Sequence, residues 1–266
     1  MFEQVTVPMN QPYKVFKLKQ YKNDQWETLE SGVILEQEVS LSVNGDIWLN
    51  FMCTPVDLEA LAVGFLFNER QVNSVDEIAS VRVCPDLTNV DVWLTKSIER
   101  PKTWRRTSGC GGGFTREIED LNAPITAPED GVLLNTSVVS KLIEQLLGSQ
   151  DLYKRVGGVH TSVLSDGQNI IVMADDIGRH NTLDKIAGHY LLDHIHLNHS
   201  ILITTGRISS EMLQKASRIG SSVLISRSSP SSLAVEYAKQ KGIILIGYAH
   251  GNQFIAYTFP DRISLF

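Results

Sequence analysis

The sequence predicts an α/β protein with a layered C-terminal core and a smaller α+β N-terminal part. From residue 131 onward, short apolar runs alternate with helical segments of about 10–15 residues, a pattern typical of parallel strands joined by crossover helices. Before residue 100, short β-type runs surround a single helical segment. Between them, the Arg-, Gly- and Pro-rich residues 101–130 show no period. We therefore divide the chain into 1–100, a connector at 101–130, and 131–266.

The N-terminal part is predicted to hold five strands and one helix. Asn44-Gly45-Asp46 lies between two β-type runs and predicts a hairpin turn. The helix is expected over 57–68, capped by Thr54 or Asp57, with Pro55 near its first turn. The expected strands are 33–35, 39–43, 47–52, 81–83 and 90–94.

The C-terminal part is predicted to form a mostly parallel sheet. A strand pair is expected around the Asp166-Gly167 turn, and a last strand at 253–258 would close an edge. The expected strands are 159–164, 169–173, 201–204, 223–225 and 243–246, and the expected helices are 137–147, 181–196, 210–218 and 231–241.

Composition excludes several classes of protein. The net charge of −6 argues against non-specific binding to nucleic acid or anionic membranes. No apolar run approaches the roughly 18–20 residues of a membrane span, and the first 20 residues lack the shape of a signal peptide, so we expect a cytoplasmic protein. Three cysteines without C-x-x-C spacing predict neither a disulfide framework nor a structural zinc site, and no H-E-x-x-H motif is present, so no metal is expected.

Three loops are predicted to meet where the strands end, and each carries an arginine. They are residues 175–181, 204–210 and 226–231, and each leads into a helix. Helix N-termini offer free N–H groups and partial positive charge, and arginine binds phosphate with two donors. We expect a site for a phosphate-rich ligand. The alternative is that the hydroxyls of these loops only cap their helices.

Cys110 lies in the middle of the connector, within Ser108-Gly109-Cys110-Gly111-Gly112-Gly113. Glycines leave the backbone poorly shielded, and the nearby Lys102, Arg105 and Arg106 favour the reactive thiolate. Such a cysteine can attack an activated sulfur and carry it as a persulfide. The alternative is a linker with an incidental cysteine.

The other candidate side chains have less distinctive surroundings. His160 and His180 could orient a ligand or act as acid–base groups, or they could be structural. Asp184 and Lys185 are expected within reach of the same site. Cys53 is predicted to be buried, and Cys84 has no evident partner.

With these residues in view, the chain resembles the formate dehydrogenase accessory sulfurtransferase family (FdhD/NarQ) from about residue 30 to 263. The most specific marker is Gly178-Arg179-His180-Asn181 followed by Asp184-Lys185. The other markers, in chain order, are Val43-Asn44-Gly45, Thr54-Pro55 with Leu61-Ala62-Val63-Gly64-Phe65-Leu66, Ser108-Gly109-Cys110-Gly111, Gly157-Gly158-Val159-His160, Gly206-Arg207 and Ser229-Pro230-Ser231-Ser232-Leu233-Ala234.

The resemblance implies a function and a fold. Family members take sulfur from a cysteine desulfurase as a cysteine persulfide and deliver it to the bis(molybdopterin guanine dinucleotide) molybdenum cofactor of formate dehydrogenase. The implied fold has a C-terminal three-layer α/β/α core similar to cytidine deaminase and a smaller α+β N-terminal part. The resemblance also implies that the protein acts as a homodimer. The deaminase zinc signature, H-x-E with P-C-x-x-C, is absent from this sequence.

The resemblance also assigns roles to residues. Cys110 matches the persulfide-bearing cysteine, and His160, Gly178, Arg179, His180, Asn181, Gly206 and Arg207 would line the cofactor site together with the C-terminal stretch Phe254, Ile255, Ala256, Tyr257, Thr258 and Phe259. Gly113 stands where the family usually has a second loop cysteine, Arg70 replaces a common glycine, and Phe259 replaces a common histidine. A cofactor-binding escort that transfers no sulfur is the alternative function.

Overall fold

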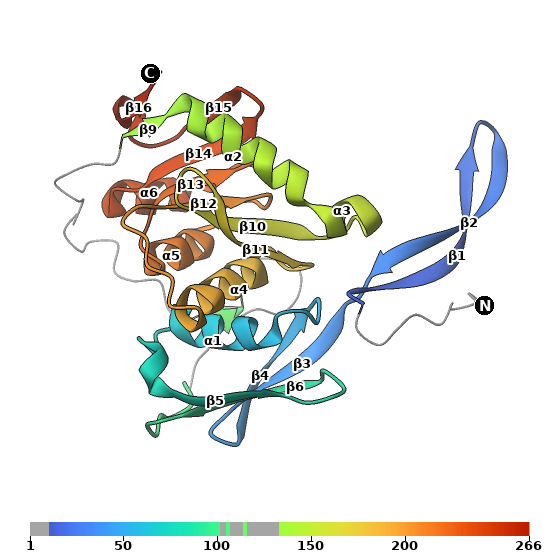
Figure 1. The fold of residues 1–266 in the computed structure, drawn as a ribbon, viewed down its shortest axis with the longest axis vertical. Coiled ribbons are helices and arrows are strands. Elements are labelled where there is room, and N and C mark those ends of the chain that lie inside the picture. The colour runs from blue at the N-terminus through green and yellow to red at the C-terminus, as the bar shows by residue number, and fades with distance from the viewer. Residues whose placement is uncertain (1–10, 102–104, 107–113, 116–132, 266) are drawn as a thin grey trace.

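The computed structural model describes residues 11–101, 105–106, 114–115 and 133–265. It shows a mixed α/β protein in which a six-stranded sheet forms the centre of the C-terminal part (Figure 1). The strand order is β11-β10-β12-β13-β14-β15. The strands are β10 (His160–Ser165), β11 (Ile170–Asp176), β12 (Ser200–Thr204), β13 (Ser221–Ser226), β14 (Ile244–His250) and β15 (Gln253–Ala256).

The central sheet is mixed: the parallel pairing expected from the alternating strands and helices of residues 201–246 is confirmed, and antiparallel strands flank it on both sides. β12, β13 and β14 run parallel, whereas β10 and β15 are antiparallel to their neighbours. The reason is the length of the connections: the turns at Gly167 and Gly251 join β10 to β11 and β14 to β15, and a short turn can only reverse the chain. Because β10 is antiparallel to both β11 and β12, the ends of β11, β12 and β13 still lie on one edge.

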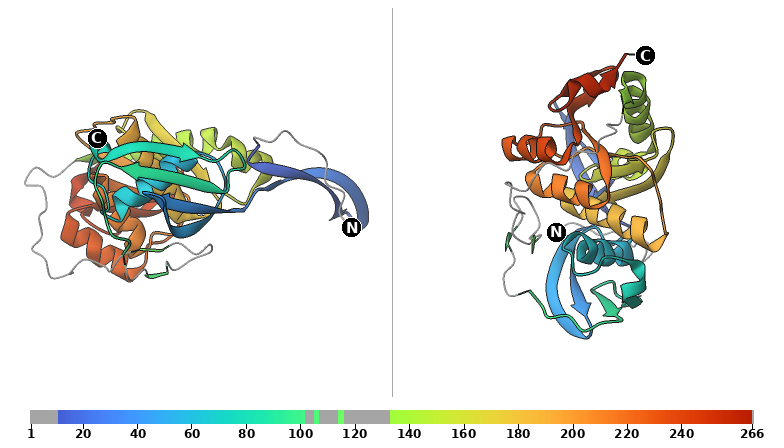
Figure 2. Two further views of the ribbon diagram at one scale, coloured as in Figure 1. Left: turned by 90° about the horizontal axis from the view of Figure 1, so that it is seen from below. Right: turned by 90° about the vertical axis from the view of Figure 1, so that its left-hand side faces the viewer.

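Helices cover both faces of this sheet and make three layers (Figures 1 and 2). On one face, α2 packs over alternate sheet residues such as Ile203, Ile225 and Ile246. On the other, α4, α5 and α6 cover Leu202, Leu224 and Leu245, which confirms the layered arrangement. The helices are α2 (Thr136–Ser149), α3 (Asp151–Val156), α4 (Arg179–Leu192), α5 (Ser210–Arg218) and α6 (Ser232–Lys241).

The N-terminal part is a four-stranded sheet with one helix, α1 (Leu58–Asn68), which lies against α4 (Figure 1). The predicted hairpin at Asn44-Gly45 joins β3 to β4 and is confirmed. The hydrophobic core of this sheet is continuous with the core beneath α4, α5 and α6. The strands are β3 (Gln37–Val43), β4 (Asp46–Cys53), β5 (Ile78–Val83) and β6 (Asn89–Leu94), and the short helix η1 (Val75–Glu77) precedes β5.

Glycines allow α1 and α4 to cross at van der Waals distance. A Cβ built on Gly64 would lie 1.7 Å from the carbonyl oxygen of Asp184, and one on Gly188 would lie 1.9 Å from that of Ala60. Backbone therefore meets backbone on both helices, and no larger side chain fits. The crossing fixes the N-terminal sheet against the helix that begins at the predicted anion site.

Several elements differ from the expectation. The long hairpin β1 (Tyr13–Lys22) and β2 (Gln25–Ile34) was predicted only at residues 33–35, because its charged residues on both faces hide the two-residue period. Asp57 precedes α1 in a left-handed conformation, and neither it nor Thr54 caps the helix with its side chain. The remaining short elements are β7 (Arg105–Arg106), β8 (Phe114–Thr115), β9 (Leu134–Asn135), β16 (Ile263–Ser264) and η2 (Pro260–Arg262).

Among residues 11–101, 105–106, 114–115 and 133–265, no helix combines the length and the apolar character needed to cross a membrane.

Candidate functional site

Three loops meet at the edge where β11, β12 and β13 end, as the sequence predicts. Two of them are joined by backbone hydrogen bonds. The Ile208 N–H donates to the Ser229 carbonyl at 3.1 Å, and the Ser231 N–H donates to the Ile208 carbonyl at 2.8 Å. The third loop, at Gly178, leads directly into α4 beside them. The N-termini of α4, α5 and α6 therefore open on the same edge.

A cavity of about 230 Å³ lies among these loops. The arginines of two predicted runs, Arg179 and Arg207, line it together with hydroxyls of the third. Gly206 makes this possible, because a Cβ there would lie 2.9 Å from the Cβ of Arg179. The full lining is Arg179, Arg207, Ile208, Ser209, Ser229, Pro230 and Ser231.

The hydroxyls of these loops cap helices and also border the cavity. Ser209 accepts from the Met212 N–H at 3.4 Å, and Ser231 accepts from the Ala234 N–H at 3.2 Å. Pro230 precedes the Ser231 cap, so it stands before the first helical residue. Ser209 and Ser231 therefore cap their helices and also lie where they could contact a ligand, so the two roles do not exclude each other.

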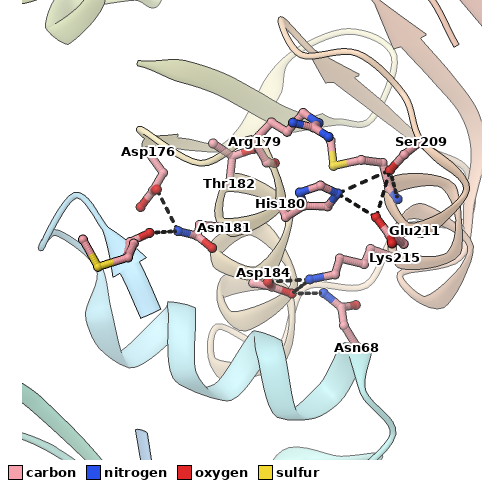
Figure 3. Close-up of polar contacts among 12 residues, drawn as sticks. Asn68, Asp176, Arg179, His180, Asn181, Thr182, Asp184, Ser209, Glu211 and Lys215 are labelled. Carbon is pink, nitrogen blue, oxygen red and sulfur yellow. Dashed lines mark hydrogen bonds and ion pairs between the residues drawn. The ribbon is translucent and has the colours of Figure 1, made fainter. Parts of the chain in front are cut away.

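His180 does not line this cavity itself but contacts Ser209, which does, and is held by two partners (Figure 3). Its Nε2 is 3.2 Å from Glu211 Oε2 and 3.3 Å from Ser209 Oγ. Burial lowers the pKa of His180 and outweighs the hydrogen bond that His180 donates to Glu211, which raises it. His180 is therefore favoured in its neutral form, with Glu211 fixing its ring. Glu211 was not singled out from the sequence, since an acid in a first helical turn is common.

A second cavity, of about 300 Å³, flanks the same loops. Here His160 Nδ1 is 3.4 Å from Thr205 Oγ1, and Arg227 Nη2 is 3.4 Å from His250 Nδ1. Burial lowers the pKa of His160, and the charges of Arg179, His180 and Arg207 lower it further. The lining residues are Gln150, Tyr153, Val159, His160, Thr205, Arg227 and His250. His160 thus faces a cavity beside the one lined by Arg179 and Arg207.

Asn181 points away from the cavity and supports the backbone (Figure 3). Its amide donates at 2.9 Å both to Asp176 Oδ1 and to the Met52 carbonyl. Asp176 Oδ1 also accepts from the Gly178 N–H at 2.7 Å. Asn181 and Asp176 therefore hold the turn at Gly178 in shape and tie it to the end of β4.

Lys185 is completely buried, which corrects the expectation that it lies within reach of the ligand site. Its ammonium group is 2.8 Å from Asp176 Oδ2 and donates to the carbonyls of Thr54 and Asp175. The physical reason is its position seven residues after Gly178, where the helix faces α1 and β4 rather than the open edge. Thr54 completes this network, because its N–H donates to Asp176 Oδ2 and its hydroxyl accepts from the Ile177 N–H.

Asp184 is likewise buried and takes part in a structural ion pair (Figure 3). Its carboxylate lies 2.5 Å from Lys215 Nζ and accepts from Asn68 Nδ2 at 2.8 Å. It joins α4 to α5 and to the end of α1. Asp184 and Lys185 therefore maintain the fold behind the site. The expectation that Asp184 lies within reach of the ligand is wrong, because it too is on the side of α4 that faces the core.

Neither cavity is lined by a residue of the C-terminal stretch. β15 is antiparallel to β14, so Phe254 starts near the loop edge and Phe259 lies toward the opposite edge. Phe254 and Phe259 pack on the α2 side, whereas the Tyr257 ring lies on the other, near the position of a Cβ at Gly247. Thr258 is buried and bonds to the backbone of β14, accepting from Leu245 N–H and donating to the Ile243 carbonyl. Ile255 and Ala256 complete the stretch, with Ile255 exposed.

The two described cysteines have different environments. Cys53 is fully buried, and desolvation raises the pKa of its thiol to about 12, which confirms its predicted burial. Cys84 does have partners: its thiol donates to Asp86 at 2.8 Å and accepts from the Asn89 N–H at 2.9 Å. Cys110 lies outside the described residues. The short strands that flank it in sequence pair with each other, Arg105 with Thr115 and Arg106 with Phe114.

Comparison with known proteins decides the family. The model of the FdhD/NarQ family matches residues 34–264. The chain belongs to the FdhD/NarQ family. The sulfur carrier protein FdhD of Bacillus licheniformis is 33% identical over 256 residues, covering 93% of this chain and 96% of that protein. The sulfur carrier protein FdhD of Staphylococcus aureus is 34% identical over 235 residues, covering 86% and 88%.

A solved structure supports the fold of this FdhD/NarQ chain. The crystal structure of a putative formate dehydrogenase accessory protein from Desulfotalea psychrophila matches with a TM-score of 0.79 and 28% sequence identity. The match covers 96% of this chain and all of that one. That protein therefore shares most of the arrangement described above.

Proposed function

We propose that this protein is a sulfur carrier for a formate dehydrogenase and that Cys110 carries the sulfur as a persulfide. Relatives at 33% and 34% identity bear the name sulfur carrier protein FdhD. The observation that carries the assignment to Cys110 is the state of the other two thiols. Cys53 is buried with a strongly raised pKa, and the thiol of Cys84 is bonded within its own turn. Of three cysteines, Cys110 is thus the candidate left for exchange.

The proposed donor is the persulfide of a cysteine desulfurase. The Cys110 thiolate attacks the outer sulfur of that persulfide, a new S–S bond forms on Cys110, and the desulfurase cysteine leaves as a thiolate. Arg105 and Arg106 precede Cys110 in sequence and favour its thiolate form. The family usually has a second loop cysteine where this chain has Gly113, so here one cysteine must both accept and deliver the sulfur. The same proposal makes the protein a sulfurtransferase that acts through a cysteine persulfide.

The proposed recipient is the bis(molybdopterin guanine dinucleotide) molybdenum cofactor, bound as substrate. The cavity at the loop edge suits its phosphates, because two arginines and the N-termini of α5 and α6 converge there. His160 and Arg227 in the adjacent cavity add donors for a further part of a large ligand. We extend the proposal to a homodimer acting in the cytoplasm, with a C-terminal core of the cytidine deaminase type.

Loading of Cys110 can be followed directly by mass spectrometry. After incubation with a cysteine desulfurase and cysteine, we expect an adduct of about 32 Da, one sulfur atom, on the peptide that contains Cys110. A Cys110→Ala variant should lack this adduct, and Cys84→Ala should keep it. An unmodified Cys110 under conditions that load a relative would contradict sulfur transfer. It would leave an escort that only binds the cofactor.

Nucleotide binding tests the second part of the proposal. We expect GDP, a probe for the guanine nucleotide end of the cofactor, to bind in isothermal titration. Arg207→Gln should weaken binding about 10-fold or more, because a charge-assisted contact to phosphate is worth roughly 1.5–3 kcal/mol. Arg82→Gln, at an exposed position on β5, is the matched control and should bind as the wild type does. Equal affinities in all three proteins would place the nucleotide elsewhere.

A further inference from the structure

The second cavity, of about 300 Å³, lies directly beside the first, because two loops contribute to both. In the loop after β12, Thr205 lines the second cavity and Arg207 lines the first. In the loop after β13, Arg227 lines the second cavity and Ser229 lines the first. The two residues of each loop are two positions apart, a span of at most about 7 Å. A ligand with its phosphates in the first cavity would therefore place a group about one sugar away in the second.

Arg227 is a hydrogen-bond donor in the second cavity that lacks acceptors. Its Nε is shielded from solvent and has no partner among the described residues. Its Nη2 is 3.4 Å from His250 Nδ1, and no carboxylate in the described part of the chain forms an ion pair with it. A buried donor without an acceptor costs free energy, and the planar guanidinium presents only donors, in a fixed fork. The cavity thus suits a ligand that holds two acceptor atoms side by side.

Gln150 brings an acceptor to the same cavity. It is 3% exposed, and its amide nitrogen donates to Thr161 Oγ1 at 3.0 Å. The Thr161 hydroxyl gives its one proton to Asp175 Oδ1 at 2.6 Å, so it can only accept from Gln150. This chain fixes the amide and leaves its carbonyl oxygen for the cavity that Gln150 lines. Tyr153 and Val159 add an aromatic and an aliphatic wall, which suit a flat ring.

We propose that the second cavity binds a fused ring with a 2-amino-4-oxo-pyrimidine edge, as in guanine and pterin, and that Arg227 and Gln150 select it. The inference rests on the cofactor proposed above and names the residues that recognise its ring. Guanine presents the acceptors O6 and N7 side by side, the pair that arginine binds with two donors. Its N1–H and 2-amino group are donors on the adjoining edge and match the carbonyl oxygen of Gln150. Adenine carries an amino group in place of O6, which would set a donor against Arg227.

Isothermal titration of the full-length protein with GDP, ADP and inorganic pyrophosphate tests this assignment. The wild type should bind GDP roughly 5- to 150-fold more tightly than ADP, the discrimination typical of one bidentate contact to a base. Arg227→Lys keeps the charge but loses the fork, so it should bring the two affinities within about 3-fold of each other and leave pyrophosphate binding unchanged. Arg227→Gln should favour ADP, because glutamine matches N6 and N7 of adenine. Arg82→Lys, on β5, is the matched control and should keep the wild-type preference for GDP.

The outcomes separate this assignment from the proposed function. A wild type that binds neither GDP nor pyrophosphate would overturn the nucleotide site and, with it, the assignment of the ring. Equal affinities of the wild type for GDP and ADP would overturn the ring assignment alone and leave the phosphate site in place. A preference for GDP that survives in both Arg227 variants would overturn the role of Arg227. Dihydroneopterin triphosphate carries the same edge on a pterin, so comparing it with GTP shows which of the two rings the cavity prefers.

Discussion

Substituting Gly64 by alanine should remove most of the stability of this protein. The added Cβ would lie 1.7 Å from the carbonyl oxygen of Asp184 and 2.4 Å from the backbone nitrogen of Gly188. Backbone atoms of a packed helix cannot move aside, so α1 and α4 must separate and open the core that they share. We expect a loss of roughly 3 kcal/mol or more in the free energy of unfolding. Gly188→Ala should act in the same way, since its Cβ meets the backbone of Ala60.

The control is a helical glycine whose Cβ position has no neighbouring atom. A Cβ on Gly148, in α2, finds no atom within 4 Å. Gly148→Ala should therefore be neutral or stabilise the protein by up to about 1 kcal/mol, because alanine is the better helix former. Urea unfolding followed by circular dichroism measures the free energy of unfolding of both variants. If Gly64→Ala and Gly148→Ala had similar midpoints, the close crossing of α1 and α4 would be wrong.

Lys185→Met should be the second severe change. Asp176 would keep its fully buried carboxylate but lose the cation 2.8 Å away. Removing one partner of a buried ion pair costs about 3–5 kcal/mol, since the remaining charge has neither water nor a counter-ion. The matched control is Lys154→Met, which removes an exposed lysine 3.7 Å from Asp151 and should change stability by less than about 1 kcal/mol.

The pH dependence of the stability of Lys185→Met shows whether the unpaired Asp176 carboxylate causes the loss. Burial already raises the pKa of Asp176 in the wild type, against the opposing charge of Lys185. Without Lys185 the folded-state pKa rises further, so the native protein binds a proton that the unfolded chain releases above its ordinary pKa near 4. The variant should therefore lose stability as the pH rises from about 5 to 8. A loss independent of pH in that range would point to the missing packing of the lysine stem instead.

The order of strands and helices in the C-terminal part follows from local sequence. Apolar strands of three to four residues separated by helical segments predicted β12 to β14 and α4 to α6 in order. The loops at Gly178, Arg207 and Ser229 were expected on one edge because the carboxyl ends of parallel strands lie together. The structure confirms that Arg179 and Arg207 line one cavity. Here local patterns were sufficient, because strand direction alone fixes which loops meet.

Local sequence patterns could not predict the roles of Asp184 and Lys185, which belong to the most specific family marker. Spacing placed Asp184 and Lys185 on the helix that follows Gly178 but could not say which side of α4 faces a ligand. Their partners Asn68, Asp176 and Lys215 come from α1, β11 and α5, and Thr54 comes from the loop after β4. A charged residue next to a ligand and one buried in an ion pair look alike in a sequence. Only the packing of α1 against α4 separates the two roles.

By itself, the sequence determined the layered α/β core and the loop edge with its arginines, and it led to the proposal that Cys110 carries sulfur. These depend on hydrophobic period, turn residues and chemical type, which are local properties of the chain. Tertiary structure decided that Asn181, Asp184 and Lys185 maintain the fold and that Gly64 and Gly188 are required where two helices touch. These depend on contacts between residues more than 100 positions apart, which no local pattern encodes.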